Sequence, residues 1–208
     1  DTYTLSNMTT EEYIRSPLFK AFGFGFKYYG EEGAPIYITH PFLKKFFAGI
    51  DWTTTAVCAH HANFDVAILT WIYGIKPAFI FDTLSMARAL YGIDVGNSAK
   101  KLAERFNLPP KGFATQSSDG LFELPLTVEQ ELADYCKHDV FLCEKFLDNM
   151  LPQFPKKELK LIDATIRMFT EPQLALDKDL LQGAIDDDAT ARATLLGKLG
   201  VLDEQLAS

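Results

Sequence analysis

The sequence has no long hydrophobic run, few cysteines and few basic residues for its length. Its longest apolar stretch, residues 66–75, is far shorter than the roughly 20 residues that a membrane span requires. The first residues are polar and lack the apolar segment of an export signal. We therefore expect a soluble protein that is not exported and does not associate with a membrane.

Only three cysteines occur, Cys58, Cys136 and Cys143. Their number is odd and their spacing matches no metal-binding pattern, so neither a disulfide framework nor a zinc site is expected. Cys136 and Cys143 fall on one face of a predicted helix, where buried thiols are the simplest interpretation. Unpaired thiols fit a reducing compartment, and we expect a cytoplasmic protein.

Basic residues are outnumbered, with 20 Lys and Arg against 28 Asp and Glu and a net charge of −8. This balance argues against a protein that grips duplex DNA through a broad basic surface. It does not exclude nucleic acid, because a nuclease that holds one chain end through metal ions must itself supply carboxylates.

The chain has 208 residues, 48% of them hydrophobic, which is enough to bury the core of one full domain. Aromatic residues alternate at Phe22, Phe24 and Phe26, and this period predicts a strand with residues 34–39 as its hairpin partner. Further strands are predicted at residues 55–59 and 78–81. Helices are predicted at residues 41–49, 63–73, 83–91, 97–106 and 128–151.

Polar residues mark the predicted helix starts, since Asp, Asn, Ser and Thr accept hydrogen bonds from the first free N–H groups. We expect caps at Asn63, Asp82, Asn97 and Thr127, the last as part of a capping box. Asp65 then falls in a first helical turn. Asp82 is interpreted as a cap rather than a metal ligand.

The second half contains a stretch rich in Pro, Gly and Ser at residues 108–126, which predicts a long loop. Beyond Pro155 the pattern changes to a helix at residues 156–169 and another capped by Asp177. We therefore divide the chain into a domain at residues 1–152 and a helical linker at residues 153–208.

Two short signatures carry the chemistry, His61-Ala-Asn-Phe-Asp65 and Tyr135-Cys-Lys-His-Asp139. Hydrolysis of a phosphodiester by two metal ions needs carboxylates that hold Mg²⁺ or Mn²⁺. Asp65 and Asp139 are the candidate ligands, and Tyr135 lies one helical turn before Asp139, where it would contact the attacking water or the phosphate. Taken singly, an Asp near a helix start is more often a cap, so the order and spacing of both signatures carry the interpretation.

The paired signatures resemble motifs two and three of the DnaQ-like 3′–5′ exonucleases, in the tyrosine-type (DEDD) branch that forms the proofreading domain of family A, phage-type DNA polymerases. The resemblance covers about residues 1–152. It implies an α/β fold of ribonuclease H-like type, with a mixed sheet flanked by helices. It also implies removal of 3′-terminal nucleotides from single-stranded DNA by two Mg²⁺ or Mn²⁺ ions.

Site roles follow from this resemblance residue by residue. Asp65 and Asp139 would be metal ligands, and Tyr135 would contact the water or the phosphate. His61, which stands where the family commonly has Asn, and Phe64 would contact the substrate. The tail is similar to the segment that leads into a polymerase domain of the same longer chain, in a bacterial or phage-infected cell.

One part of the family pattern is absent, because no Asp-x-Glu occurs anywhere in the sequence. In the family, that motif lies on the first, central strand and supplies two of four carboxylates. We therefore expect a slot in the sheet where this strand is missing, and little exonuclease activity from these 208 residues alone. The chain would then be a fragment, or an upstream segment would supply the strand.

Two other functions remain open at the level of sequence. A non-catalytic module that binds DNA or positions a polymerase would also lack Asp-x-Glu. An exonuclease that trims RNA is disfavoured by the tail after Pro155. Codons just upstream of Asp1 would discriminate, since an Asp-x-Glu there supports the enzyme.

Isolated basic residues and histidines are interpreted conservatively. The basic side chains of the predicted 97–106 helix and the following loop are expected to be solvated, with contact to the DNA backbone as the alternative. The same conservative interpretation makes His60 and His138 packing or solvated residues. The basic side chains are Lys100, Lys101, Arg105 and Lys111.

Overall fold

The computed structural model describes residues 7–112, 121 and 123–199. The described chain divides into two compact units, Asp1–Glu171 and Pro172–Ser208. The helices are α1 (Thr10–Arg15), α2 (Leu43–Ala48), α3 (Ala62–Tyr73), α4 (Thr83–Tyr91), α5 (Ala99–Arg105), α6 (Leu126–Met150), α7 (Lys156–Thr170) and α8 (Lys178–Leu199). The strands are β1 (Gly23–Phe26), β2 (Ile36–Thr39), β3 (Ala56–Ala59) and β4 (Phe79–Asp82).

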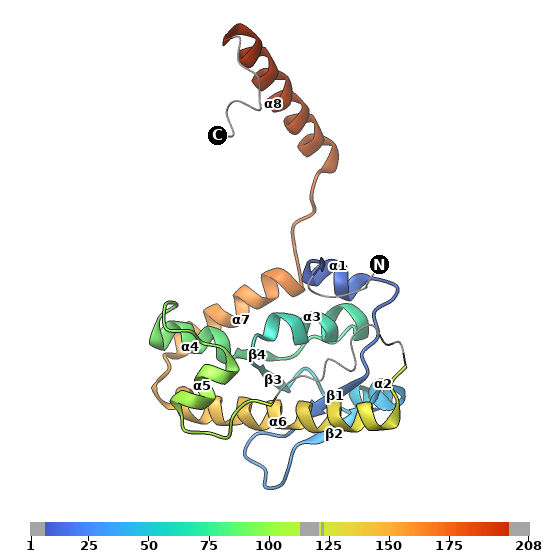
Figure 1. Cartoon of the computed structure of the whole chain (residues 1–208), viewed down its shortest axis with the longest axis vertical. Helices are drawn as coiled ribbons and strands as arrows, with labels where there is room; N and C mark the ends of the chain where they lie inside the picture. The colour runs from blue at the N-terminus through green and yellow to red at the C-terminus, as the bar shows by residue number, and fades with distance from the viewer. Residues whose placement is uncertain (1–6, 113–120, 122, 200–208) are drawn as a thin grey trace. The chain divides into compact units, whose positions relative to one another are not determined.

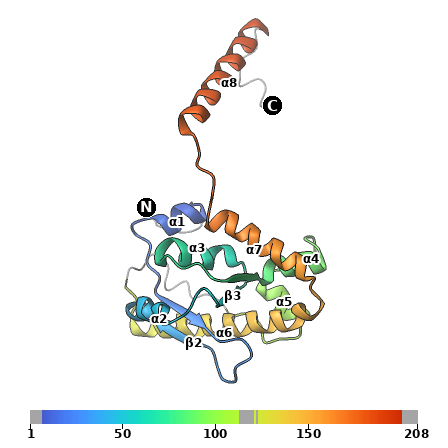
Figure 2. The same ribbon diagram turned by 180° about the vertical axis from the view of Figure 1, so that it is seen from behind.

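In the first unit, strands lie between helices on two sides (Figures 1 and 2). The long helix α6 covers one side and contacts β1, β2 and β3. Helices α3 and α7 pack together on the other side, against β4. α6 packs closely on β1 at Gly25, where an added Cβ would lie only 2.6 Å from Cys136 Sγ.

The four described strands form two separate sheets rather than the single mixed sheet that the family resemblance implies. β1 and β2 pair antiparallel, with Gly23 opposite Thr39, as the alternating aromatics predict. β3 and β4 pair parallel, with Ala56 opposite Phe79. Within the described residues no strand joins β1 to β3, so each of these strands has one unpaired edge.

Of the four caps predicted before residue 152, three are wrong and one is confirmed. Helix α3 begins after His61, not at Asn63; α5 is capped by Ser98, not by Asn97; and α6 begins after Pro125 without a side-chain cap, rather than at Thr127. Asn97 instead donates from Nδ2 to the carbonyl oxygen of Gly92. Asp82 caps α4 as predicted, accepting from the backbone N–H groups of Leu84 and Ser85.

Among the residues described for this unit, the core forms three buried clusters. The largest joins α4, α5 and α6 around Phe146 and Met86, and includes Ala99, Leu102 and Ala103 of α5. A second joins α2 and α3 around Phe47 and Leu69, and a third joins α3, β4 and α7 around Ile80 and Ile166. Burial of this size anchors both α3 and α6, the two helices that carry the sequence signatures.

The boundary between the units lies after Glu171 rather than near residue 152. Helix α7 belongs to the first unit because it packs on α3 and β4, and because Asp163 Oδ1 accepts a hydrogen bond from the backbone N–H of Ile80 at 2.9 Å. The described part of the second unit contains α8, whose start Asp177 caps by accepting from the Leu180 N–H. No helix in the described part of the chain has the length and apolar character of a membrane span.

Candidate active site

Asp82 at the end of β4 fixes the start of α3, which carries Asp65. Its Oδ1 accepts hydrogen bonds from the backbone N–H groups of His61 at 2.8 Å and Ala62 at 3.2 Å. These are the N–H groups that a helix start leaves without partners. His61 has a left-handed backbone with φ of 72°, which few residues other than glycine adopt, so the carboxylate of Asp82 holds a strained turn directly before the helix.

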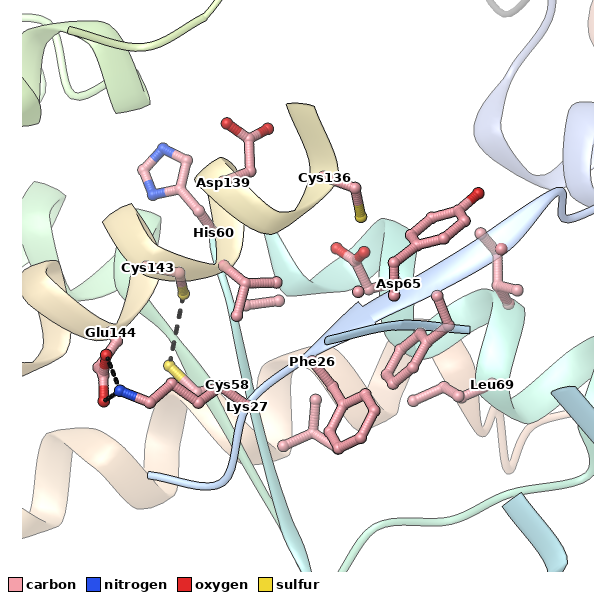
Figure 3. A pocket seen from close by; sticks show the side chains of 18 of the residues that line it. Phe26, Lys27, Cys58, His60, Asp65, Leu69, Cys136, Asp139, Cys143 and Glu144 are labelled. Atoms are coloured by element: carbon pink, nitrogen blue, oxygen red, sulfur yellow. Dashed lines mark hydrogen bonds and ion pairs between the residues drawn. The ribbon is translucent and has the colours of Figure 1, made fainter. Parts of the chain in front are cut away.

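Helix α6 presents Tyr135 and Asp139 on one face, since they are one turn apart. Both side chains line a cavity together with Asp65 of α3. The cavity has a volume of about 550 Å³ and is bounded by β1 and β3 as well as by the two helices. Figure 3 shows Asp65 and Asp139 among its lining side chains. The structure thus brings three of the five predicted site residues into one cavity.

The other two predicted residues lie elsewhere. Phe64 stacks on Tyr13 of α1 with ring centroids 6.4 Å apart, and His61 is exposed at the start of α3. Neither residue lines the cavity. Their predicted contact with a substrate therefore stays a prediction.

Asp65 lies in an unfavourable place for a negative charge. The residue is exposed at the cavity, yet the surrounding protein desolvates the carboxyl group and raises its pKa to about 6. The negative charges of Asp82 and Asp139 raise this pKa further. Among the described residues, no ion pair involves Asp65. A bound cation would remove this electrostatic penalty.

Asp139 has one oxygen paired and one oxygen without a partner. Oδ2 lies 3.1 Å from Lys111 Nζ, while Oδ1 is buried and has no hydrogen-bond partner among the described residues. Such an atom is costly unless a donor or a cation reaches it. Lys111 Nζ also lies 5.3 Å from the ring centroid of Tyr135.

Tyr135 remains protonated at neutral pH. Burial raises its pKa, the hydrogen bond to Lys111 opposes this rise, and the charge of Asp139 adds to it. The phenol therefore acts as a hydrogen-bond donor rather than as a base.

His60 is a structural residue, as predicted, although it also lines the cavity. Its Nδ1 lies 3.0 Å from Thr83 Oγ1, and the Thr83 hydroxyl donates to the carbonyl oxygen of Ala59, so Nδ1–H is the donor to Thr83. Burial lowers the pKa of His60 to about 4, which keeps the ring neutral at physiological pH.

Sequence interpretation missed two features of this site. Lys111 was expected to be solvated, but it pairs with Asp139, and nothing in the sequence around it signals this pairing. The thiols of Cys58 and Cys143 lie 3.7 Å apart on the cavity wall. They belong to β3 and α6 and meet only because the fold brings these elements together.

Comparison with known proteins agrees with the class that this geometry suggests, a nuclease. The family model described as 3′–5′ exonuclease matches residues 39–154, which is more than half of the 208 residues. The chain belongs to this family, the exonuclease domain of the family A polymerase type, as the sequence signatures predicted. No curated protein and no solved structure gave a significant match.

Membership of this family implies nuclease hydrolase activity, and exonuclease domains of the family generally use divalent metals. The carboxylates of Asp65 and Asp139 are the oxygen donors that Mg²⁺ and Mn²⁺ prefer, and the unpartnered Oδ1 of Asp139 suits a cation. However, the described residues contain no group of three or more metal-binding side chains. These two aspartates alone therefore do not form a complete metal site.

Proposed function

We propose that this chain is the 3′–5′ exonuclease portion of a DNA polymerase and takes part in hydrolysing 3′-terminal nucleotides from single-stranded DNA ends. The observation that carries the proposal is the convergence of Asp65 from α3 and Asp139 from α6, with Tyr135, on one cavity. The signatures are far apart in the sequence, and independent caps or packed aromatics would have no reason to meet there.

The cavity itself supports a further element of the proposal, a strand between β1 and β3. A strand residue in a sheet occupies roughly 160 Å³, from its rise, the strand spacing and the thickness of the layer. The volume of about 550 Å³ thus admits roughly three to four strand residues, similar to the length of β1 and β3. Such a strand would pair with both free edges and join the two sheets into one.

Residues of both β1 and β3 line the cavity, which favours this interpretation. At β4, the far edge of its sheet, Asp163 of α7 accepts from the Ile80 N–H, and this contact blocks the pairing of another strand. Tyr37 Oη is buried and has no partner among the described residues, and Tyr37 also lines the cavity. A strand would supply a partner for such atoms.

We infer that this strand carries an Asp-x-Glu. Alternate residues of a strand point to the same side, so its two carboxylates would face one direction. With Asp65 and Asp139 they would make four ligands for two Mg²⁺ or Mn²⁺ ions, which supply the charge that stabilises the cleavage of a phosphodiester. An upstream segment of a longer polypeptide is the proposed source.

Tyr135 has a defined role in this proposal. Its protonated hydroxyl donates a hydrogen bond to an oxygen of the scissile phosphate or of the attacking water. Desolvation of the phenol, which raises its pKa, favours this donor form over a phenolate. We propose that His61 and Phe64, at the start of α3, contact the nucleotides at the 3′ end.

A non-catalytic module that binds DNA or positions a polymerase is the second candidate function. The observation that favours it is the incomplete set of metal-binding side chains. In either function we propose that α8 leads toward a polymerase domain of the same longer chain. An RNA-trimming exonuclease is less well supported, because the matched family is the exonuclease domain of the family A polymerase type.

The experiment that decides between these functions completes the strand. The chain is produced with an N-terminal extension, a Gly/Ser linker and a Val/Ile-rich strand that contains Asp-x-Glu. It is incubated with Mn²⁺ and a single-stranded oligonucleotide labelled at its 5′ end. We expect stepwise shortening from the 3′ end, and little shortening by the unextended chain.

Two matched controls make the result specific. An extension with Asn-x-Gln preserves the strand and removes its charges, and Asp139→Ala in the active extension removes the ligand on α6. Both are expected to abolish shortening while circular dichroism shows an unchanged fold. A folded Asp-x-Glu protein that shortens no oligonucleotide, or an Asp139→Ala variant that retains full activity, would contradict the enzymatic proposal.

A further inference from the structure

A short segment of the chain, Pro110–Gly112, is attached to α6 beside the candidate site. His138 Nε2 donates to the carbonyl oxygen of Pro110 at 2.9 Å, since a carbonyl only accepts. Lys111 pairs with Asp139, and Gly112 lies close to the ring of Tyr135, which a Cβ on the glycine would meet at 3.4 Å. Three successive residues thus contact one face of α6.

Lys111 is positioned as a cation for the carboxylate cluster. Its Nζ lies 3.1 Å from Asp139 Oδ2, and the two side chains are only 30% and 34% exposed. Burial lowers the pKa of Lys111, but the hydrogen bond to Tyr135 and the charge of Asp139 outweigh burial and raise it, so the amine is charged. Among the described residues, this is the one ion pair made by either candidate ligand.

The position of this ammonium conflicts with metal binding. A divalent cation held by Asp139 would share this carboxylate with the ammonium group of Lys111. Two cations on one carboxylate repel each other, and the partly buried position screens this repulsion less than bulk water would. A cation on the unpartnered Oδ1 would therefore weaken the attraction between Lys111 and Oδ2 and favour departure of the lysine.

We propose that Lys111 is a built-in counter-ion that competes with divalent cations for Asp139. This inference rests on the proposed function, since it takes Asp139 as a metal ligand. In the absence of metal the lysine neutralises Asp139 and holds residues 110–112 against α6. When a divalent cation binds, Lys111 is displaced, and its amine and the segment that carries it are released from the site.

The test measures binding of Mn²⁺ to the full chain by electron paramagnetic resonance of the free ion, without any substrate. Lys111→Met keeps the length of the side chain and removes its charge. Loss of a partly exposed ion pair should tighten Mn²⁺ binding about five- to tenfold. Lys101→Met is the matched control, because Lys101 forms an ion pair with Glu104 at 2.9 Å outside the cavity lining, and it should leave Mn²⁺ binding unchanged.

Asp139→Asn tests the ligand role of Asp139 separately from competition by Lys111. If this variant lowers Mn²⁺ binding but Lys111→Met does not raise it, competition by the lysine is refuted and Asp139 remains a ligand. If Mn²⁺ binding is unaffected by Asp139→Asn, the proposed ligand role of Asp139 fails as well. Equal or weaker binding by Lys111→Met, including no detectable binding by either protein, overturns the inference.

A second measurement follows the lysine itself. The wild-type chain is treated with a limiting amount of an amine-acetylating reagent, and modification is quantified at each lysine by mass spectrometry. Millimolar Mn²⁺ should increase acetylation of Lys111 several-fold and leave Lys101 unchanged. Constant acetylation of Lys111 at Mn²⁺ concentrations that saturate the site would show that the lysine is not displaced.

Discussion

The charge on Asp65 should make the protein less stable, and Asp65→Asn removes this charge with little change in shape. The pKa of Asp65 is raised to about 6 from 3.8, so the unfolded state ionises first. The protonated carboxyl group of Asp65 therefore contributes fully to stability below about pH 4, and this contribution is lost as the pH rises through 6. Full desolvation would make this loss about 3 kcal/mol, but cavity water screens the charge, and we expect about 1–2 kcal/mol.

The assay is thermal unfolding by circular dichroism at pH 4 and pH 8 in a metal-free buffer. At pH 8, Asp65→Asn should raise the melting temperature by about 2–8 °C, given roughly 2–4 °C per kcal/mol for a domain of this size. At pH 4 the two proteins should melt together. Asp94→Asn, at an exposed position, serves as the control. A variant that is no more stable than the wild type at pH 8 would refute the reasoning.

Three other changes test the framework of the site. Burial lowers the pKa of His60 to about 4 from 6.5, so the neutral ring contributes to stability above pH 6.5 and this contribution is lost as the pH falls through 4. In urea unfolding, His60→Gln should reduce the free energy of unfolding that is lost on acidification by about 2–3 kcal/mol. Asp82→Ala takes acceptors from two helix starts and should cost about 2–4 kcal/mol in urea unfolding, whereas a cost near that of a surface change would contradict the capping role. Gly25→Val should destabilise by more than about 2 kcal/mol, because its Cβ would approach Cys136 Sγ to 2.6 Å, and an unchanged melting temperature would mean that α6 does not pack so closely.

Local patterns in the sequence predicted most of the secondary structure. The alternation of Phe22, Phe24 and Phe26 predicted the hairpin that β1 and β2 form. The cap at Asp82 was predicted because helix starts have strong local preferences. The caps proposed at Asn63 and Asn97 were wrong, since in both places another group satisfies the helix start, and for α3 this group is a carboxylate on β4.

For the candidate site as well, local patterns predicted some features and missed those that depend on distant residues. The two signatures fix Asp65, Tyr135 and Asp139 in the sequence, and the spacing of one helical turn predicts that Tyr135 and Asp139 share a face. The partnership of Lys111 with Asp139 had no local signal, because it depends on how the chain after α5 returns along α6. The position of Phe64 against Tyr13 likewise depends on the packing of α1 on α3.

The sequence by itself determined the family, through two signatures whose residue types suit metal-assisted hydrolysis, and it showed that Asp-x-Glu is absent. Only the tertiary structure decided how the strands pair and what surrounds the two aspartates. In the structure β1 and β3 belong to separate sheets, both strands line a cavity of about 550 Å³, and Lys111 pairs with Asp139. Strand edges and ion pairs between distant residues are set by packing across the whole domain, and short-range patterns in a sequence do not encode them.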